Sequence, residues 1–304
     1  MRVLIIGLGS IARKHIHALK SIDTSIMIYA LRSNRNVEHI EDIINIYSFE
    51  EINDLNIDFV ILSNPTGYHL QYLKELEKIS TPLFIEKPLF DTTGAAEEKL
   101  VQDIATSNIP TYVACNLRFL DAIIKIREMV QLERVNEVNV YCGSYLPDWR
   151  SGADYKTIYS ANKEMGGGVH LDLIHELDYI YWIFGKPELT KSTFRSKSSL
   201  EITSYDYANY LWFYDAFVVN VVLNYFRKDV KRSLEIVCES GTYCVNLLQN
   251  KIYYNNQVVF ESKQKMIETY KSQLIFFINK VIKYNDKFNS IDQAYKIMQL
   301  CLTD

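Results

Sequence analysis

The chain has 304 residues, of which 48% are hydrophobic and 23% charged, and its formal net charge is −4. This length allows two domains of ordinary size, and the composition is that of a globular protein. The small negative charge argues against nucleic acid and anionic membranes as partners, because both select strongly basic surfaces. Since no apolar stretch approaches the ~20 residues that span a bilayer, we expect no membrane partner.

The five cysteines are scattered and form no CxxC pair: Cys115, Cys142, Cys238, Cys244 and Cys301. Zinc sites and disulfide frameworks need clustered spacings, so we expect neither. A metal site made of His170, His175 and Glu176 would lack the HExxH spacing, and we predict no metal. Reduced thiols are typical of a cytoplasmic protein.

The first 120 residues alternate apolar runs with helical segments. The expected strands are Arg2–Gly7, Ser25–Leu31, Phe59–Ser63, Leu83–Glu86 and Thr111–Ala114. The expected helices lie near Ala12–Lys20, His69–Lys78 and Thr93–Ser107. Strands that are apolar throughout are those covered on both faces. Residues 1–120 are therefore predicted to form a doubly wound parallel sheet, a Rossmann domain in the α/β class.

The pattern changes after Asn136, where strand-like segments with alternating polarity begin. The expected strands are Glu137–Tyr145, Asp206–Phe213, Phe217–Tyr225, Arg232–Cys238 and Lys251–Tyr254. One continuous helix is expected over Val169–Phe184, and two late helices over Met266–Lys283 and Ile291–Leu300. Residues 121–304 are predicted to form an α+β domain with a largely antiparallel open sheet. A C-terminal helix of this second domain can pack back on the first domain.

One expected strand is aromatic on both faces, with Tyr205, Tyr207 and Phe213 alternating with Tyr210, Trp212 and Tyr214. A sheet with one face in water does not have this pattern. Either a helix or a second subunit is expected to cover the second face.

A glycine-rich turn follows the first expected strand and opens the first helix, with Gly7, Gly9 and Ala12 in the pattern G-x-G-x-x-A. Gly7 permits the tight turn, Gly9 lets the backbone approach a pyrophosphate, and Ala12 allows close helix–strand packing. Amides of the first helical turn, around Ser10 and Ile11, carry positive partial charge towards an anion. We predict a dinucleotide site, with a purely structural turn as the alternative.

The end of the second strand bears on the choice of cofactor. NAD-selective sites usually place an acid there, whereas Leu31-Arg32-Ser33-Asn34-Arg35 contains none. The guanidinium groups of Arg32 and Arg35 and the hydroxyl of Ser33 suit a 2′-phosphate. NADP is therefore favoured over NAD, and an ordinary solvated basic loop is the alternative.

Three motifs resemble the Gfo/Idh/MocA oxidoreductases in their order and separation. They are Gly7-x-Gly9, Glu86-Lys87-Pro88 at a strand end, and Gly166-Gly-Gly168-Val-His-Leu-Asp172; Asn64-Pro65-Thr66 with His69, and Arg118-Phe119, are further matches. The resemblance implies hydride transfer at a carbon that bears a hydroxyl or carbonyl, usually on a sugar or cyclitol. It also implies a second domain whose open sheet often mediates oligomerisation, here as a homodimer or homotetramer.

Matching positions in that family imply that Lys87 is the catalytic lysine, that Pro88 is a cis proline, and that Asp172 is the carboxylate of the substrate helix. The resemblance also implies cofactor contacts at the strand ends, from Asn64, Pro65, Thr66, His69, Glu86, Lys87 and Asn116. Arg118, further along, is expected to contact the substrate.

On a continuous helix, Asp172, His175, Glu176 and Tyr179 would share one face. A polar face on a largely buried helix suits a cleft that faces the nicotinamide. Histidine has an intrinsic pKa near ~6.5, so His175 is suited to take the hydroxyl proton while Lys87 stabilises charge on the same oxygen. Many family members place the histidine four residues after the aspartate, where this chain has Glu176. Glu176 is therefore the alternative acid/base.

Aromatic and cationic residues lead from the first strand of the second domain to the glycine triplet. Trp149 and Tyr155 are suited to stack on sugar rings, and Arg150 and Lys163 to hold a carboxylate or phosphate. This mixture suits an acidic or nucleotide-linked sugar, and a connecting loop with aromatic anchors is the alternative.

The favoured function is an NAD(P)-dependent dehydrogenase or reductase acting on the CH–OH group of a sugar, sugar acid or nucleotide sugar. One alternative is a redox-cycled lyase or glycosidase with a tightly bound cofactor. Another is a non-catalytic sensor that only binds the cofactor.

Overall fold

The computed structural model describes residues 1–35, 40–150 and 152–303. They cluster into two compact units. Unit 1 comprises Met1–Asn116 and Met266–Met298, and unit 2 comprises Leu117–Lys265 and the last residues from Gln299. The late helices expected to follow the second domain thus lie mostly in unit 1.

Unit 1 is built on a six-stranded parallel sheet in the order β3-β2-β1-β4-β5-β6. The strands are β1 (Arg2–Ile6), β2 (Met27–Leu31), β3 (Ile43–Ile46), β4 (Phe59–Leu62), β5 (Leu83–Glu86) and β6 (Thr111–Ala114). Every residue of β4, β5 and β6 is buried, as the apolar runs predicted. The strand order is that of dinucleotide-binding doubly wound sheets, and it confirms the predicted Rossmann fold.

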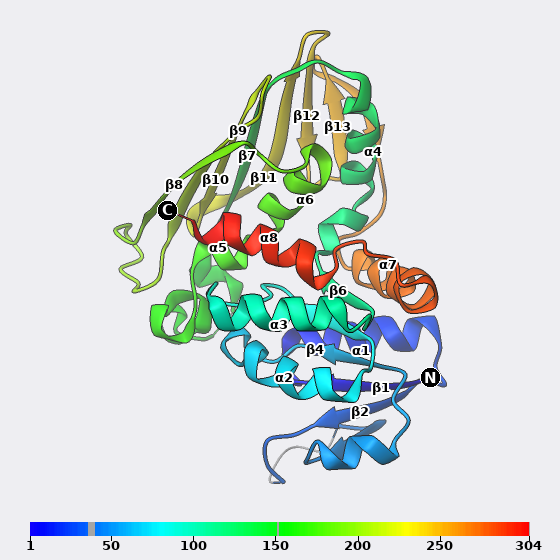
Figure 1. The fold of residues 1–304 in the computed structure, drawn as a ribbon. Coiled ribbons are helices and arrows are strands. Elements are labelled where there is room, and N and C mark those ends of the chain that lie inside the picture. Colours follow the sequence, from blue (N-terminus) through cyan, green and yellow to red (C-terminus); the bar gives the residue numbers. More distant parts are fainter. Residues whose placement is uncertain (36–39, 151, 304) are drawn as a thin grey trace. The chain divides into compact units, whose positions relative to one another are not determined.

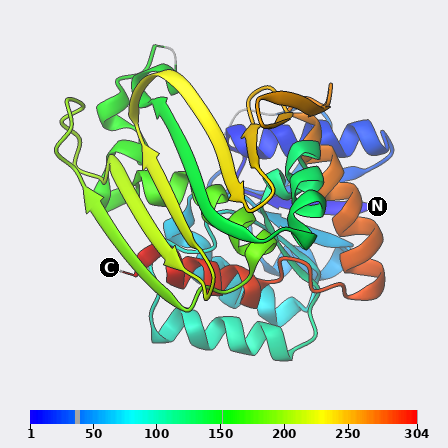
Figure 2. The same ribbon diagram turned by 90° about the horizontal axis from the view of Figure 1, so that it is seen from above.

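The helices of unit 1 come from both ends of the chain. They are α1 (Ser10–Ile22), α2 (His69–Ile79), α3 (Ala95–Thr106), α7 (Glu268–Phe276), the π-helical η9 (Phe277–Ile282) and most of α8 (Ile291–Leu302), with short 3-10 turns η1 (Glu50–Asp54) and η2 (Thr66–Tyr68). Helix α7 lies beside α1 (Figure 1, Figure 2), and Lys271 Nζ donates to the carbonyl oxygen of Ser21 at 2.9 Å. A segment from the end of the chain therefore covers the first helix.

An aromatic cluster joins this late segment to the sheet. The ring centroid of Phe277 lies 5.3 Å from that of Phe59 and 5.4 Å from that of Phe84, and all three side chains are fully buried. Burying each such ring stabilises the fold by roughly 1.5–3 kcal/mol. Residues of η9 are thus part of the core that packs on the parallel sheet.

Unit 2 is built on an eight-stranded sheet in the order β14-β13-β12-β11-β7-β10-β9-β8. The strands are β7 (Val135–Tyr145), β8 (Leu189–Arg195), β9 (Tyr207–Phe213), β10 (Val218–Asn224), β11 (Phe226–Cys238), β12 (Thr242–Asn246), β13 (Lys251–Tyr254) and β14 (Gln257–Glu261). Only the β7–β10 pair is parallel among the pairings of the described strands. The predicted, largely antiparallel sheet is confirmed.

Short helices pack beside this sheet. They are α4 (Asp121–Met129), α5 (Val169–Asp172) and α6 (His175–Phe184), with the 3-10 turns η3 (Asn116–Phe119), η4 (Val130–Leu132), η5 (Leu146–Trp149), η6 (Tyr155–Thr157), η7 (Tyr159–Ala161) and η8 (Lys163–Met165). The prediction of one helix over Val169–Phe184 was wrong. The helix is interrupted at Leu173 and Ile174, where Leu173 has φ −102° and ψ 25°.

The two faces of β9 differ in exposure. Tyr210 and Trp212 are buried on one face, whereas Tyr207, Leu211 and Phe213 are half-buried on the other. The Tyr210 hydroxyl donates to the carbonyl oxygen of Cys301 at 2.9 Å, so the chain end helps to cover the first face. Among the described residues, no helix has the length and apolar character needed to cross a membrane.

Candidate active site

The glycine loop after β1 leaves open space at the start of α1. Gly7 has φ +91°, and a Cβ there would lie 2.5 Å from backbone atoms of Asn64, so any side chain would displace the end of β4. A Cβ at Gly9 would meet no atom within 4 Å, and the first turn of α1 carries no acidic residue. This geometry leaves room for an anion beside the amides of the first helical turn.

Two side chains that follow strands on either side of β1 carry buried polar atoms that lack partners among the described residues. They are the amide oxygen and nitrogen of Asn64, after β4, and Nη1 of Arg32, after β2. Burying such groups without a hydrogen bond is costly, and a ligand that supplies partners removes that cost. Since both follow strands at the edge where Gly7 ends β1, these residues fit a bound dinucleotide.

His69 lies behind the loops of this edge. It is 1% exposed, and its ring nitrogens lie 3.0 Å from the Leu89 carbonyl oxygen and 3.1 Å from that of Asn64. Burial lowers the pKa of His69, which keeps the ring neutral. His69 therefore joins the loops after β4 and β5, and the structure supports a role in holding Asn64 rather than in touching the cofactor. Thr66, at the start of η2, is also buried, while Pro65 is exposed.

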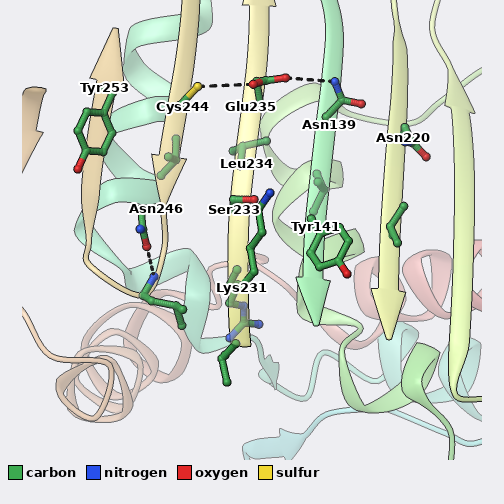
Figure 3. A pocket seen from close by; sticks show the side chains of 16 residues that line it. Asn139, Tyr141, Asn220, Lys231, Ser233, Leu234, Glu235, Cys244, Asn246 and Tyr253 are labelled. Carbon is green, nitrogen blue, oxygen red and sulfur yellow. Dashed lines mark hydrogen bonds between the residues drawn. The ribbon is translucent and has the colours of Figure 1, made fainter. Parts of the chain in front are cut away.

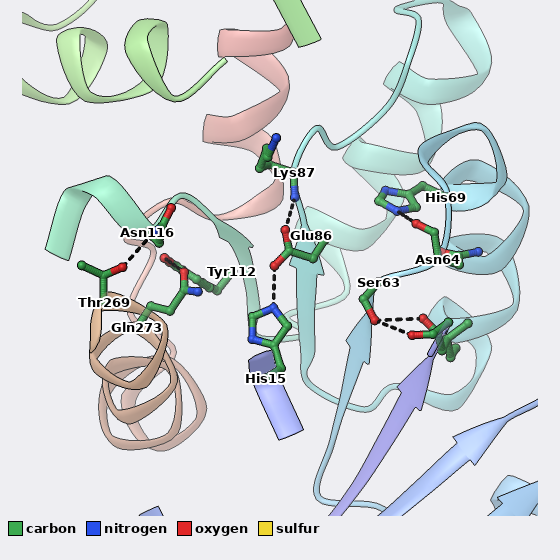
Figure 4. A network of polar contacts seen from close by, with 12 residues as sticks. His15, Ser63, Asn64, His69, Glu86, Lys87, Tyr112, Asn116, Thr269 and Gln273 are labelled. Carbon is green, nitrogen blue, oxygen red and sulfur yellow. Dashed lines mark hydrogen bonds and ion pairs between the residues drawn. The ribbon is translucent and has the colours of Figure 1, made fainter. Parts of the chain in front are cut away.

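The Glu86-Lys87-Pro88 segment ends β5 at the same edge of the sheet. Lys87 is half-buried and the Lys87–Pro88 peptide bond is cis. Glu86 is buried, its Oε1 lies 2.5 Å from Nε2 of His15, and its Oε2 accepts the Lys87 N–H at 3.2 Å (Figure 4). The carboxylate thus faces protein groups on both of its oxygens.

Asn116, expected to contact the cofactor, is held by the late helix α7. Its Nδ2 donates to Thr269 Oγ1 at 2.7 Å, and the hydroxyl of Tyr112 donates to Gln273 Oε1 at 3.2 Å (Figure 4). Both contacts lie within unit 1. Helix α7 therefore fixes the end of β6, a role that no motif in the sequence indicated.

In unit 2, Asp172 belongs to a cluster that the sequence predicted only in part. The Tyr225 hydroxyl donates to Asp172 Oδ2 at 2.5 Å, and the Trp149 ring meets that of Tyr225 edge-on at 5.3 Å. Burial, and then the charge of Asp172, raise the pKa of Tyr225 well above its usual range, so the phenol keeps its proton. Trp149 is 39% exposed beside this pair. A lone tyrosine after a strand gives no signal in the sequence, and Tyr225 was missed.

The helix break separates the environments of Asp172, His175 and Glu176. Asp172 ends α5 and His175 begins α6, both half-buried, whereas Glu176 is fully buried. Arg232 of β11 binds Glu176 through two hydrogen bonds, Nε–Oε1 at 2.6 Å and Nη2–Oε2 at 2.9 Å. The expectation of one polar helix face was therefore wrong, and the structure assigns Glu176 to an ion pair. Tyr179 is fully buried in the core.

Arg118 is not presented to a ligand, contrary to expectation. Its guanidinium binds Asp178 of α6 through two hydrogen bonds of 2.8 Å, and both side chains are only 2% exposed. Two buried arginine–carboxylate pairs, from Arg118 and Arg232, thus fix α6. They set the position of His175, the first residue of that helix.

The remaining predicted substrate residues lie on the loop between β7 and α5. Arg150 and Lys163 are exposed, and Lys163 Nζ lies 5.8 Å above the Tyr205 ring. The Tyr155 hydroxyl donates to the carbonyl oxygen of Leu200 at 3.1 Å, so this side chain anchors the loop. Of the four predicted loop residues, Trp149 is the one that lies near Asp172: its ring contacts Tyr225, whose hydroxyl binds Asp172.

Two family models cover most of the chain. Residues 1–111 match the Gfo/Idh/MocA oxidoreductase family with an NAD-binding Rossmann fold, and residues 123–244 match the Gfo/Idh/MocA C-terminal domain. The chain belongs to the Gfo/Idh/MocA family. The resemblance inferred from the three motifs is confirmed.

Comparison with individual Gfo/Idh/MocA proteins adds relatives with named activities. Myo-inositol 2-dehydrogenase of Thermotoga maritima is 26% identical over 193 residues, which are 61% of this chain and 55% of that protein. The alignments with curated relatives span about half of each relative's length.

Solved structures share the fold over the whole chain. A levoglucosan dehydrogenase in complex with NADH has a TM-score of 0.84 at 15% identity, covering 99% of this chain and 95% of that chain. UDP-N-acetylglucosamine 3-dehydrogenase of Acidithiobacillus ferrooxidans has a TM-score of 0.78 at 16% identity, with the same coverage. At such identities the likeness establishes the fold of this family member.

Proposed function

We propose that this Gfo/Idh/MocA member is an NAD(P)-dependent dehydrogenase or reductase. It moves a hydride between nicotinamide and a hydroxyl- or carbonyl-bearing carbon of a sugar, sugar acid or nucleotide sugar. The main support is the position of Lys87 at the sheet edge that also carries Asn64 and the open Gly9 loop. Relatives named as dehydrogenases of myo-inositol, levoglucosan and UDP-N-acetylglucosamine support the substrate class.

In this proposal each polar side chain has one task. Bound nicotinamide supplies the hydride acceptor in oxidation and the hydride donor in reduction. Lys87 donates a hydrogen bond to the substrate oxygen and stabilises negative charge on it. His175 takes the hydroxyl proton in oxidation and returns it in reduction. Asp172, held by Tyr225, orients the imidazole, and Trp149 beside it contacts the sugar ring.

A spectrophotometric screen tests the proposed reaction. The intact protein is mixed with NADP⁺ or NAD⁺ and a panel of sugars, uronic acids and nucleotide sugars, and reduced nicotinamide is followed by its absorbance. We expect substrate-dependent formation of reduced cofactor with at least one compound. Product formed without net change in the cofactor would instead support the redox-cycled lyase or glycosidase, and tight cofactor binding without any turnover would support the sensor.

The cofactor preference rests on the loop after β2. Arg32 carries the buried Nη1 without an acceptor among the described residues, and Arg35 lies over the Tyr47 ring at 4.9 Å. We propose that Arg32, Ser33 and Arg35 bind the 2′-phosphate of NADP.

Replacing Arg35 by alanine is expected to raise the Kd for NADPH about 10-fold, because a hydrogen bond between charged groups is lost. The Kd for NADH should stay within about twofold, since NADH lacks the 2′-phosphate. Fluorescence titration measures both constants, and Arg13→Ala, an exposed cation on α1, is the matched control. An equal effect on both cofactors, or a wild-type preference for NADH, would contradict the assignment.

We also propose that the protein forms a homodimer or homotetramer through the open face of the unit 2 sheet. That face carries half-buried apolar side chains such as Val222 and Leu211, and a cavity of about 510 Å³ lined by Tyr141, Ser233 and Tyr253 among others (Figure 3). Apolar sheet faces of this kind usually pack against another surface. Light scattering should give two or four times the chain mass, and a monomer at all concentrations would refute the proposal. A cytoplasmic location is proposed because the five cysteines, all among the described residues, form no disulfide.

A further inference from the structure

We infer that His15 is a positioning residue for Lys87 and that it acts through Glu86. The inference rests on the proposed role of Lys87 in the reaction. It gives a role to His15, a buried histidine of α1. The cofactor motif does not explain this residue.

One carboxylate connects the helix to the lysine. His15 lies on α1 and is fully buried, with Nε2 at 2.5 Å from Glu86 Oε1. The other oxygen of Glu86 accepts the backbone N–H of Lys87 at 3.2 Å (Figure 4). The direction of the Glu86 side chain, set by His15, therefore determines where the Lys87 backbone is held.

The surroundings of His15 indicate which nitrogen carries the proton. Nδ1 of His15 is buried and has no hydrogen-bond partner among the described residues. A carboxylate oxygen can only accept a hydrogen bond, so we assign a proton to Nε2, which donates to Glu86 Oε1. A hydrogen bond with one charged partner is short and strong, which makes it suitable for fixing geometry.

Two aromatic rings fix the orientation of the imidazole. Phe84, two residues before Glu86 on β5, meets the ring edge-on at 5.0 Å, and Tyr270 of α7 meets it at 5.7 Å. The imidazole is thus held from the sheet and from the late helix at the same time. Rotation of the ring away from Glu86 would break packing on both sides.

Helix α1 contributes to both the proposed cofactor site and the support of Lys87. The N-terminus of α1 faces the open glycine loop, while His15, further along it, supports Glu86 and Lys87. Loss of the His15 hydrogen bond should therefore displace Lys87 but leave the glycine loop in place. Small displacements of a catalytic group can reduce turnover by about 100-fold.

Three variants of the full-length protein test this role. His15→Leu removes the donor, His15→Gln keeps an N–H near the position of Nε2, and His17→Leu changes an exposed histidine on the same helix. For each, NADH affinity is measured by fluorescence and turnover with the first substrate found in the screen. The environment of Lys87 is observed by NMR after reductive ¹³C-methylation, with its signal assigned by its absence in Lys87→Arg.

We expect His15→Leu to lower kcat by about 30- to 100-fold and to shift the Lys87 signal, with the Kd for NADH within about threefold. His15→Gln should stay within about fivefold of the parent in kcat, because the donor is retained. His17→Leu should resemble the parent in all three measurements. Should His15→Leu fail to fold, Glu86→Gln takes its place, with the same expected separation of kcat from NADH affinity.

Parent-like kcat and an unshifted Lys87 signal in His15→Leu would overturn the inference. So would a loss of NADH affinity as large as the loss of turnover, since that result describes general damage to unit 1. Failure of the proposed function is distinguishable: no screened substrate would then be turned over, whereas the Lys87 NMR signal in the His15 variants would still report whether His15 positions the lysine.

Discussion

Replacing Lys87 by methionine is expected to lower kcat by roughly 10²–10³-fold while the Kd for NADH changes by less than about threefold. Methionine keeps the apolar stem but cannot donate a hydrogen bond or carry charge. The negative charge that develops on the substrate oxygen would then lack its main stabilising group. The cofactor phosphates are expected to bind at the glycine loop and α1, which the substitution leaves unchanged. Steady-state kinetics with the screened substrate and fluorescence titration with NADH measure the two effects.

Two further variants make this result specific. Lys87→Arg keeps the positive charge but places it on a planar guanidinium in place of a compact ammonium group. It should therefore have more activity than Lys87→Met but less than the parent. Lys99→Met on α3, where the lysine side chain is 75% exposed, should behave as the parent. Full turnover in Lys87→Met would remove this residue from the mechanism.

The parallel sheet was predictable because its strands are buried on both faces. β4 and β5 appear in the sequence as continuous apolar runs, and the glycine pattern after β1 marks the phosphate loop. β3 was missed because Ile43–Ile46 is a short strand at the sheet edge. In unit 2, β8, β12 and β14 were missed as well; β8 and β14 are edge strands with many exposed positions.

The site was harder to predict, because its decisive contacts join residues far apart in the sequence. The apolar periodicity of Val169–Phe184 continues through the break at Leu173, with no glycine or proline to mark it. The two short helices are held by hydrogen bonds from Tyr225 to Asp172 and from Arg232 to Glu176, and both partners lie more than fifty residues further along the chain. Arg118 looked like a substrate ligand because its partner, Asp178, cannot be identified from spacing. The motifs predict the residues that we propose to react, whereas tertiary contacts show which polar groups are held in pairs within the protein.

Replacing Glu176 by alanine is expected to lower the free energy of unfolding of unit 2 by about 3–5 kcal/mol. Arg232, whose side chain is 17% exposed, would lose the carboxylate that binds it with two hydrogen bonds. An arginine guanidinium keeps its charge in proteins, so the variant would leave the charge of Arg232 without the carboxylate that now binds it. Urea unfolding followed by near-UV circular dichroism measures the loss. Glu261→Ala, which removes the partly exposed pair with Lys251, should cost at most about 1 kcal/mol.

The double variant Glu176→Leu with Arg232→Met should recover much of that stability, because buried ion pairs often tolerate replacement by apolar groups. Its activity separates the two candidates for proton transfer. If Glu176 only holds α6, the double variant keeps turnover as long as His175 keeps its position. In that case His175→Asn loses turnover but has the same free energy of unfolding as the parent. If Glu176 is the acid/base, the order is reversed, and the stable double variant is inactive. The geometry of Glu176 favours the first result, because the carboxylate is fully buried and both of its oxygens accept hydrogen bonds from Arg232, whereas His175 is half-buried at the start of α6.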